Sequence, residues 1–145
     1  MIDACAFQGM FVRQVLNRAS KVLAIEPSPQ NLCWLRAIAE RHKNVDVVPY
    51  ALWNEPCVLT LNLCEKPYLD SVFNFSSERI IKKIKVKAVT LDSLTKNFDT
   101  IGFLKMDIEG AEIEALKGAE ETLQKTKKLL LHRTTLEKDA KQRSL

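Results

Sequence analysis

The chain has 145 residues, with 22 Lys and Arg, 18 Asp and Glu, a formal net charge of +4 and only 4 Gly. Hydrophobic residues make up 46% of the chain and charged residues 28%, which excludes collagen-like, low-complexity and strongly disordered proteins. This length predicts one domain over residues 1–132, followed by a polar tail over 133–145. Because no apolar run is long enough to span a membrane and no signal peptide is recognisable, we expect a cytoplasmic protein without membrane contact.

Hydrophobic periodicity predicts that strands and helices alternate in the first third of the chain. The expected elements are a strand ending at residue 3, a helix over 10–19, a strand over 21–25, a helix over 29–43 and a strand over 45–52. Ser28 followed by Pro29 marks the start of the second helix, with serine as N-cap and proline at the first helical position. Such alternation predicts an α/β fold with a mostly parallel sheet and helices on its faces.

The pattern then changes and later returns to alternation. The expected elements are a strand over 58–63, an irregular stretch over 64–79, a strand over 84–91, a helical turn over 92–96, a strand over 101–108, a helix over 111–123 with Ile113 on its apolar side, and a strand over 129–131. The middle of the chain therefore reads as a β-rich insertion between the third and fourth strands of the core sheet.

Most of the net positive charge falls in one short segment. Five basic residues lie there: Arg79, Lys82, Lys83, Lys85 and Lys87. A nucleic-acid interface is one explanation, but the segment has no interleaved aromatic residues, and its alternation favours a half-buried strand with a solvated lysine face. The four cysteines show no C-x-x-C spacing and only two His accompany them, so we expect free thiols and no metal site.

In an open parallel sheet, ligands bind beyond the carboxyl ends of the strands. Glu26 lies at such an end, 17 positions after Gly9, where its carboxylate can accept hydrogen bonds from the ribose hydroxyls of a nucleoside. A carboxylate that only flanks the next helix is the alternative. Asp107 and Glu109 follow the fourth core strand and fall at the same edge.

The loop after the first strand distinguishes two classes of cofactor. It holds one glycine, Gly9, and begins at Asp3, whereas a dinucleotide needs a G-x-G-x-x-G turn to approach its pyrophosphate. The Asp3 carboxylate would repel a pyrophosphate but attract the ammonium and sulfonium of S-adenosyl-L-methionine (SAM). Charge therefore favours SAM over NAD, and a simple turn aspartate is the remaining alternative for Asp3.

Several motifs, taken in order, resemble the FkbM family of SAM-dependent methyltransferases. They are Asp3-x-Cys5-Ala6-x-x-Gly9, Glu26-Pro27-x-Pro29, Tyr50-Ala51-Leu52, Val89-Thr90-Leu91-Asp92-Ser93-Leu94 and Asp107-x-Glu109-Gly110-x-Glu112. The resemblance implies a Rossmann-like methyltransferase sheet and O-methylation of a hydroxyl on a sugar or another small metabolite. Because the strands that usually follow in the family are not recognisable after residue 131, we expect an incomplete edge of the sheet, exposed or covered by a second copy of the chain.

The resemblance also assigns roles to individual residues. The loop residues Asp3, Cys5, Ala6 and Gly9 would surround the methionine end of SAM, Glu26 would bind the ribose, and Tyr50, Ala51 and Leu52 would flank the adenine. The candidates for the general base that removes the acceptor proton are Asp107, Glu109 and His132, with acceptor binding and purely structural roles as alternatives. Lys105 shares a strand face with Asp107, which would allow the two to form an ion pair.

Two features leave the activity open, the short ends of the sequence relative to the family pattern and the residue at position 5. Cys5 stands where the family usually has a glycine that lets the backbone approach the cofactor, so the alternative is a degenerate module that binds SAM or a partner without turnover. The acceptor pocket would come from the insertion, which mixes aromatic and polar side chains, unless that stretch is an ordinary surface loop. Those side chains are Tyr68, Asp70, Ser71, Phe73 and Phe75.

Overall fold

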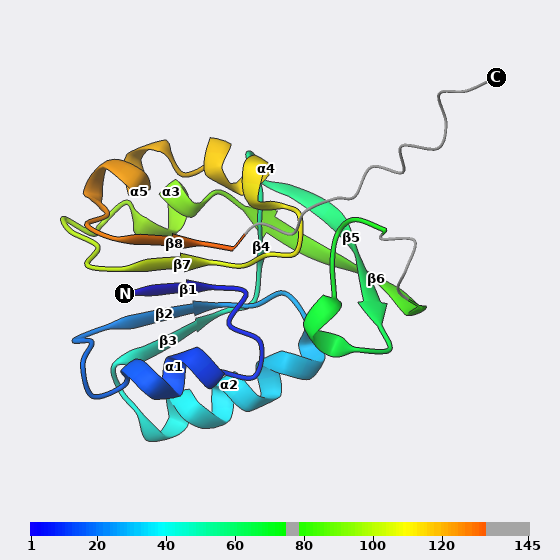
Figure 1. The fold of residues 1–145 in the computed structure, drawn as a ribbon, viewed down its shortest axis with the longest axis horizontal. Coiled ribbons are helices and arrows are strands. Elements are labelled where there is room, and N and C mark those ends of the chain that lie inside the picture. The colour runs from blue at the N-terminus through cyan, green and yellow to red at the C-terminus, as the bar shows by residue number, and fades with distance from the viewer. Residues whose placement is uncertain (75–78, 133–145) are drawn as a thin grey trace.

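A computed structural model of the chain describes residues 1–74 and 79–132. Its centre is a sheet of five parallel strands in the order β3-β2-β1-β7-β8 (Figure 1). The strands are β1 (Ile2–Ala4), β2 (Val22–Ile25), β3 (Val45–Val48), β7 (Leu104–Met106) and β8 (Leu129–Leu131). The predicted parallel α/β sheet is thus confirmed, and its strand order reverses between β1 and β7. The tail predicted over 133–145 lies outside the described residues.

Helices cover both faces of this sheet, with α1 and α2 on one side and α3, α4 and α5 on the other (Figure 1). Their bounds are Met10–Val15 for α1, Pro29–Arg41 for α2, Leu91–Thr95 for α3, Glu112–Lys117 for α4 and Glu120–Lys125 for α5. Alternate residues of β2 enter opposite cores, since Ala24 packs with Leu35 whereas Ile25 packs with Leu91. Burial on both faces explains why this strand is a continuous apolar run.

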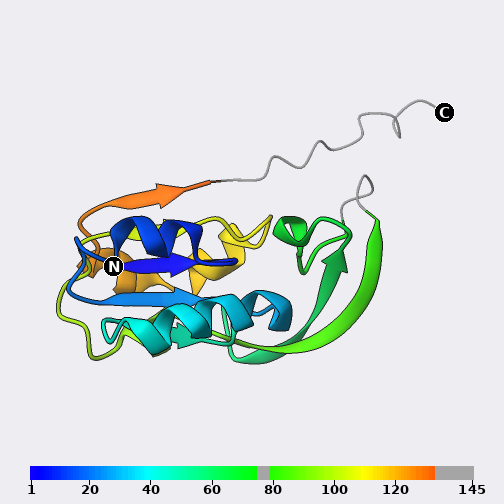
Figure 2. The same cartoon turned by 90° about the horizontal axis from the view of Figure 1, so that it is seen from below.

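The predicted β-rich insertion forms a second sheet of three strands in the order β4-β6-β5. Its elements are β4 (Ala51–Leu52), β5 (Cys57–Cys64), the short 3-10 helix η1 (Pro67–Leu69) and β6 (Ile80–Val89). β5 and β6 pair antiparallel and extend beyond the end of the central sheet to which β1 points (Figure 2). The strand predicted over 45–52 is wrong as one element, because β3 pairs with β2 whereas β4 pairs with β6. Pro49, which has no N–H to donate, lies between the two.

The helix predicted over 111–123 is in fact two helices that break at Gly118. A Cβ at Gly118 would lie 2.4 Å from the Trp53 carbonyl oxygen, so the backbone there passes too close to a neighbour for any side chain. Ile113, predicted on the apolar side of this helix, is instead exposed. The prediction of its burial is therefore wrong. The first helix is likewise shorter than predicted and ends at Val15.

The predicted lysine face and the predicted sheet edge are both present. Along β6, Lys85 and Lys87 are exposed while Val86 between them is buried. β8 forms one edge of the central sheet, and all three of its leucines are exposed. What covers that edge stays a prediction. None of the helices in the described part of the chain is both long and apolar enough to cross a membrane.

Candidate active site at the carboxyl ends of the strands

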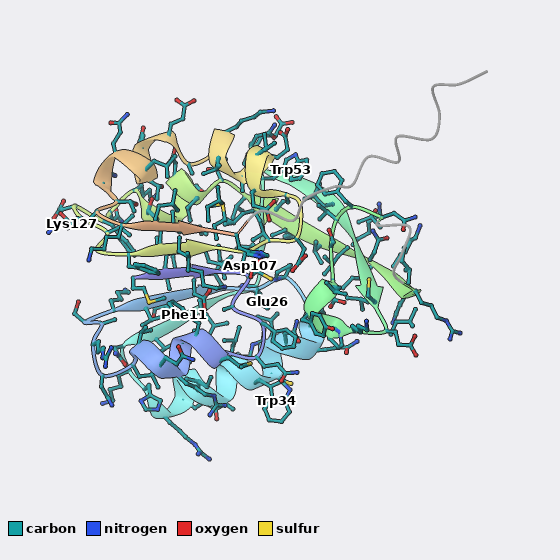
Figure 3. All side chains as sticks on the ribbon, viewed as in Figure 1. Phe11, Glu26, Trp34, Trp53, Asp107 and Lys127 are labelled. Carbon is teal, nitrogen blue, oxygen red and sulfur yellow. The ribbon has the colours of Figure 1, made fainter. Side chains whose placement is uncertain are left out.

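Two hollows lie beyond the carboxyl ends of the central strands, and Cys5 lines both of them. The Tyr50 hollow is mainly apolar and is lined among others by Cys5, Ile25, Tyr50, Ala51, Leu52 and Asp70. The Asp3 hollow has four charged residues in its lining, and is lined among others by Asp3, Phe11, Tyr68, Lys105, Asp107 and Glu109. Figure 3 shows Glu26 and Asp107 at the same end of the central strands. The hollows thus occupy the switch point where open parallel sheets bind ligands.

The loop between β1 and α1 keeps an unusual backbone conformation. Cys5, Phe7 and Gly9 have φ values of 64°, 50° and 82°. All three lie in the left-handed region, which residues other than glycine rarely adopt. Cys5 therefore follows the path of a glycine although it carries a side chain. Burial raises the pKa of its thiol well above the usual range, with the neighbouring Glu26 carboxylate as the next cause, so the sulfur is a neutral group between the hollows.

Asp3 is completely buried, with an exposed fraction of 0%, and it pairs with a lysine from the adjacent strand. The Lys105 ammonium donates a hydrogen bond of 3.0 Å to Asp3 Oδ1, while Asp3 Oδ2 has no hydrogen-bond partner among the described residues. Burial raises the pKa of Asp3, and the Lys105 charge lowers it in part. The expected pairing of Lys105 with Asp107 is wrong, because the parallel register places Lys105 beside Asp3.

Glu26 is buried at the end of β2, and its carboxylate accepts several hydrogen bonds. Oε2 accepts from the Phe7 amide at 2.9 Å, and Oε1 accepts from the Ser28 amide at 2.9 Å and from the Asn31 side chain at 3.3 Å. Burial raises its pKa, and these bonds offset part of that rise. The Cys5 side chain also hydrogen-bonds to this carboxylate. Glu26 therefore holds the first loop in place, and it lies behind the residues that line the two hollows.

The residues of the acidic motif lie together at the end of β7. Asp107 Oδ1 is 3.1 Å from Nδ1 of His132, whose side chain has an exposed fraction of 71%. Glu109 lies in the turn before α4 with φ 49°. Glu112 accepts hydrogen bonds of 3.1 Å from the amides of Ile108 and Gly110. The structure therefore brings the three predicted catalytic residues to one end of the sheet.

Comparison with known proteins identifies the family. The sequence model of the methyltransferase FkbM domain matches residues 3–140. The chain belongs to the FkbM methyltransferase family. A crystal structure of methyltransferase FkbM from Methylobacillus flagellatus KT has a similar fold, with a TM-score of 0.65 and 22% identity over 92% of this chain. The chain spans 33% of that protein's length. No curated protein gives a significant match.

In this FkbM-family chain the insertion reaches across the site through two hydrogen bonds. Ser28 Oγ, which was predicted to cap α2, instead donates to Asp70 Oδ2 at 3.0 Å. Ser71 Oγ donates to the backbone carbonyl of Glu109 at 2.6 Å. The segment after η1 thus ties the end of β2 to the turn after β7, and Tyr68 beside it lines the Asp3 hollow.

The structure brings some of the predicted site residues together and leaves others apart. Tyr50, Ala51 and Leu52 line the Tyr50 hollow together with Asp70, Ser71 and Val72, and their roles toward a cofactor or an acceptor stay predictions. The Phe73 ring contacts the Trp53 ring at a tilt of 41°, with ring centroids 6.2 Å apart. Phe75 lies outside the described residues. The pairing of Lys105 was missed, because it depends on the register between β1 and β7. Within the described ranges, no group of three His, Cys, Asp or Glu side chains is placed to hold a metal ion.

Proposed function

We propose that this FkbM-family chain is a SAM-dependent methyltransferase that methylates a hydroxyl oxygen of a sugar or another small metabolite. The observation that carries the proposal is the meeting of an apolar and a charged hollow at Cys5, beside the strand-order switch point. SAM joins a flat adenine ring to an amino acid with an ammonium, a carboxylate and a neighbouring sulfonium. The two hollows therefore match the two ends of SAM in chemistry.

Individual residues fit SAM in the same way. Tyr50, Ala51 and Leu52 offer an apolar surface for the adenine, and Glu26 would accept from a ribose hydroxyl in place of one of the hydrogen bonds that it now accepts. Asp3 supplies a buried carboxylate oxygen that no described residue satisfies. Buried polar atoms without partners are uncommon in native proteins, so an ammonium donor at this position would remove a cost of the fold.

The chemistry left to the protein is positioning of the acceptor and removal of its proton. SAM, when bound, supplies an electrophilic methyl group on sulfur. Asp107 and Glu109 both line the Asp3 hollow, and either carboxylate can accept the proton of an acceptor hydroxyl. His132 lies 3.1 Å from Asp107, so its imidazole can orient that carboxylate or take the proton from it. Tyr68 at the same hollow offers a ring and a hydroxyl to the acceptor.

The experiment that tests this function is calorimetric titration with S-adenosylhomocysteine, followed by a methyl-transfer assay on a panel of hydroxylated metabolites. We expect binding, and we expect Asp107→Asn to lower turnover by roughly 100-fold if Asp107 is the base, with the affinity for S-adenosylhomocysteine unchanged. Absence of binding at millimolar concentration contradicts the proposal. Binding without turnover on any acceptor supports the alternative, a module that binds SAM without catalysis, for which the Cys5 side chain in the cofactor loop is the specific observation.

A further inference from the structure

One ion pair lies across the switch point of the central sheet. Asp3 in β1 and Lys105 in β7 face each other in the parallel register, with 3.0 Å between Asp3 Oδ1 and the lysine nitrogen. Both side chains line the Asp3 hollow. The pair is therefore at the end of the sheet where open parallel folds bind ligands.

Both partners keep hydrogen-bonding capacity that the described residues do not use. Asp3 Oδ2 is buried without a hydrogen-bond partner. The Lys105 ammonium has three donors, and within the described ranges its contacts are the hydrogen bond to Asp3 and the face of the Phe11 ring, 5.9 Å from the ring centroid. If the ion pair only stabilised the fold, we would expect its remaining donor and acceptor atoms to have hydrogen-bond partners within the protein.

We infer that Asp3 and Lys105 together recognise the zwitterionic α-amino-acid end of the methyl donor, with Lys105 as the ligand of its carboxylate. This inference rests on the proposed function and adds a binding residue to it. Asp3 Oδ2 accepts from the ligand's ammonium, while the free donors of Lys105 bind the ligand's carboxylate. A ligand with both charges on one carbon satisfies both unused groups at once.

The charges around the hollow agree with this arrangement. Asp3, Asp107 and Glu109 contribute three carboxylates, and Lys105 is the cation among the residues that line the hollow. A ligand carboxylate would be repelled by the three acidic side chains unless a positive charge received it. Lys105 can supply this positive charge. Its side chain is largely buried, so water screens the attraction to a ligand carboxylate only weakly.

The test compares two ligands that differ in the amino-acid end alone. S-adenosylhomocysteine carries that end, whereas 5′-methylthioadenosine lacks it, and calorimetry measures the Kd of each. For Lys105→Met we expect the affinity for S-adenosylhomocysteine to fall by about 10-fold to 100-fold, the value of a charge-assisted hydrogen bond. The affinity for 5′-methylthioadenosine should stay within about twofold, because the adenosine contacts are untouched.

A matched control exists beside the amino end of β2. Lys21 pairs with Asp46 at 2.8 Å and lies 5.9 Å from the centroid of the Phe98 ring, so it repeats the lysine, carboxylate and ring arrangement in a more exposed setting. Lys21→Met should leave both affinities unchanged. Since Lys105→Met leaves a buried carboxylate unpaired, the double variant Asp3→Asn with Lys105→Met removes both charges and should show the same selective loss in a more stable protein.

The outcomes separate this inference from the function on which it rests. If the unmodified protein binds neither ligand, the proposed function fails and the inference fails with it. If the protein binds S-adenosylhomocysteine but Lys105→Met leaves that affinity unchanged, or weakens both ligands equally, the inference alone is overturned. The inference is supported if Lys105→Met and the double variant both lose affinity for S-adenosylhomocysteine while keeping their affinity for 5′-methylthioadenosine.

Discussion

Replacing Glu112 by Ala tests whether this carboxylate holds the acidic turn in shape. Glu112 has an exposed fraction of 2%, and its Oε1 accepts the amides of Ile108 and Gly110, both at 3.1 Å. A hydrogen bond to a charged group contributes about 1.5–3 kcal/mol. Since alanine removes two such bonds, we expect the free energy of unfolding to fall by about 3 kcal/mol, a value at the low end because water can reach the partly exposed turn.

The assay is urea denaturation followed by circular dichroism, with the free energy of unfolding extrapolated to water. Glu112→Gln keeps an acceptor oxygen and should cost about 1 kcal/mol, because the two bonds lose their charge but not their geometry. Glu120→Ala, at an exposed site on α5, is the control and should cost less than about 1 kcal/mol. A loss below about 1 kcal/mol for Glu112→Ala would show that the turn does not depend on this side chain.

Two further predictions concern packing and pH. Gly118→Ala should lower the free energy of unfolding by about 2 kcal/mol or more, because the added Cβ would lie 2.4 Å from the Trp53 carbonyl oxygen. Gly102→Ala is the control and should be neutral in the same urea unfolding assay, because nothing lies within 4 Å of its Cβ position. Equal effects of the two variants would refute the steric argument. Burial raises the pKa of Asp70 above 3.8, so the unmodified protein loses stability as the pH rises through that raised pKa. Asp70→Asn has no charge to lose and can keep the bond to Ser28 through its amide. Its free energy of unfolding, measured in urea, should therefore rise relative to that of the unmodified protein between pH 3 and pH 7. A difference in free energy between the two proteins that stays constant with pH would contradict this reasoning.

The sequence was a good guide where one local pattern decides the structure. Burial on both faces requires an apolar run, so β2 could be placed within one residue. The switch from helical spacing to alternation located the insertion. The acidic motif after the fourth core strand marked the end of the sheet at which Asp107 and His132 now lie together.

The sequence was a poor guide where a contact distant in the chain decides the outcome. Ser28 has the local pattern of a helix cap, but its hydroxyl bonds to Asp70, 42 positions away. Lys105 shares a face with Asp107 along its own strand, yet it pairs with Asp3 on the neighbouring strand. That pairing depends on the register between β1 and β7, which hydrophobic periodicity does not predict. The same holds for Gly118, where a helix that the apolar spacing predicts as continuous breaks at a residue that packs against the distant Trp53 carbonyl.

The backbone at Cys5 links the resemblance to the geometry. The resemblance marks this position as one that glycine usually occupies, and the structure gives Cys5 a φ of 64°, the left-handed conformation that glycine adopts most readily. The loop between β1 and α1 thus follows a backbone path that suits glycine, and Cys5 adds a neutral thiol between the two hollows. Whether that thiol reduces the affinity for the donor is decided by the titration with S-adenosylhomocysteine described above.

The most direct test of the account is a crystal structure of the protein with S-adenosylhomocysteine. The account predicts the adenine in the Tyr50 hollow, beside Tyr50 and Leu52, and the amino-acid end in the Asp3 hollow, within hydrogen-bond distance of Asp3 and Lys105. S-adenosylhomocysteine bound elsewhere on the surface, or bound with its amino-acid end in the Tyr50 hollow, would contradict the central claim.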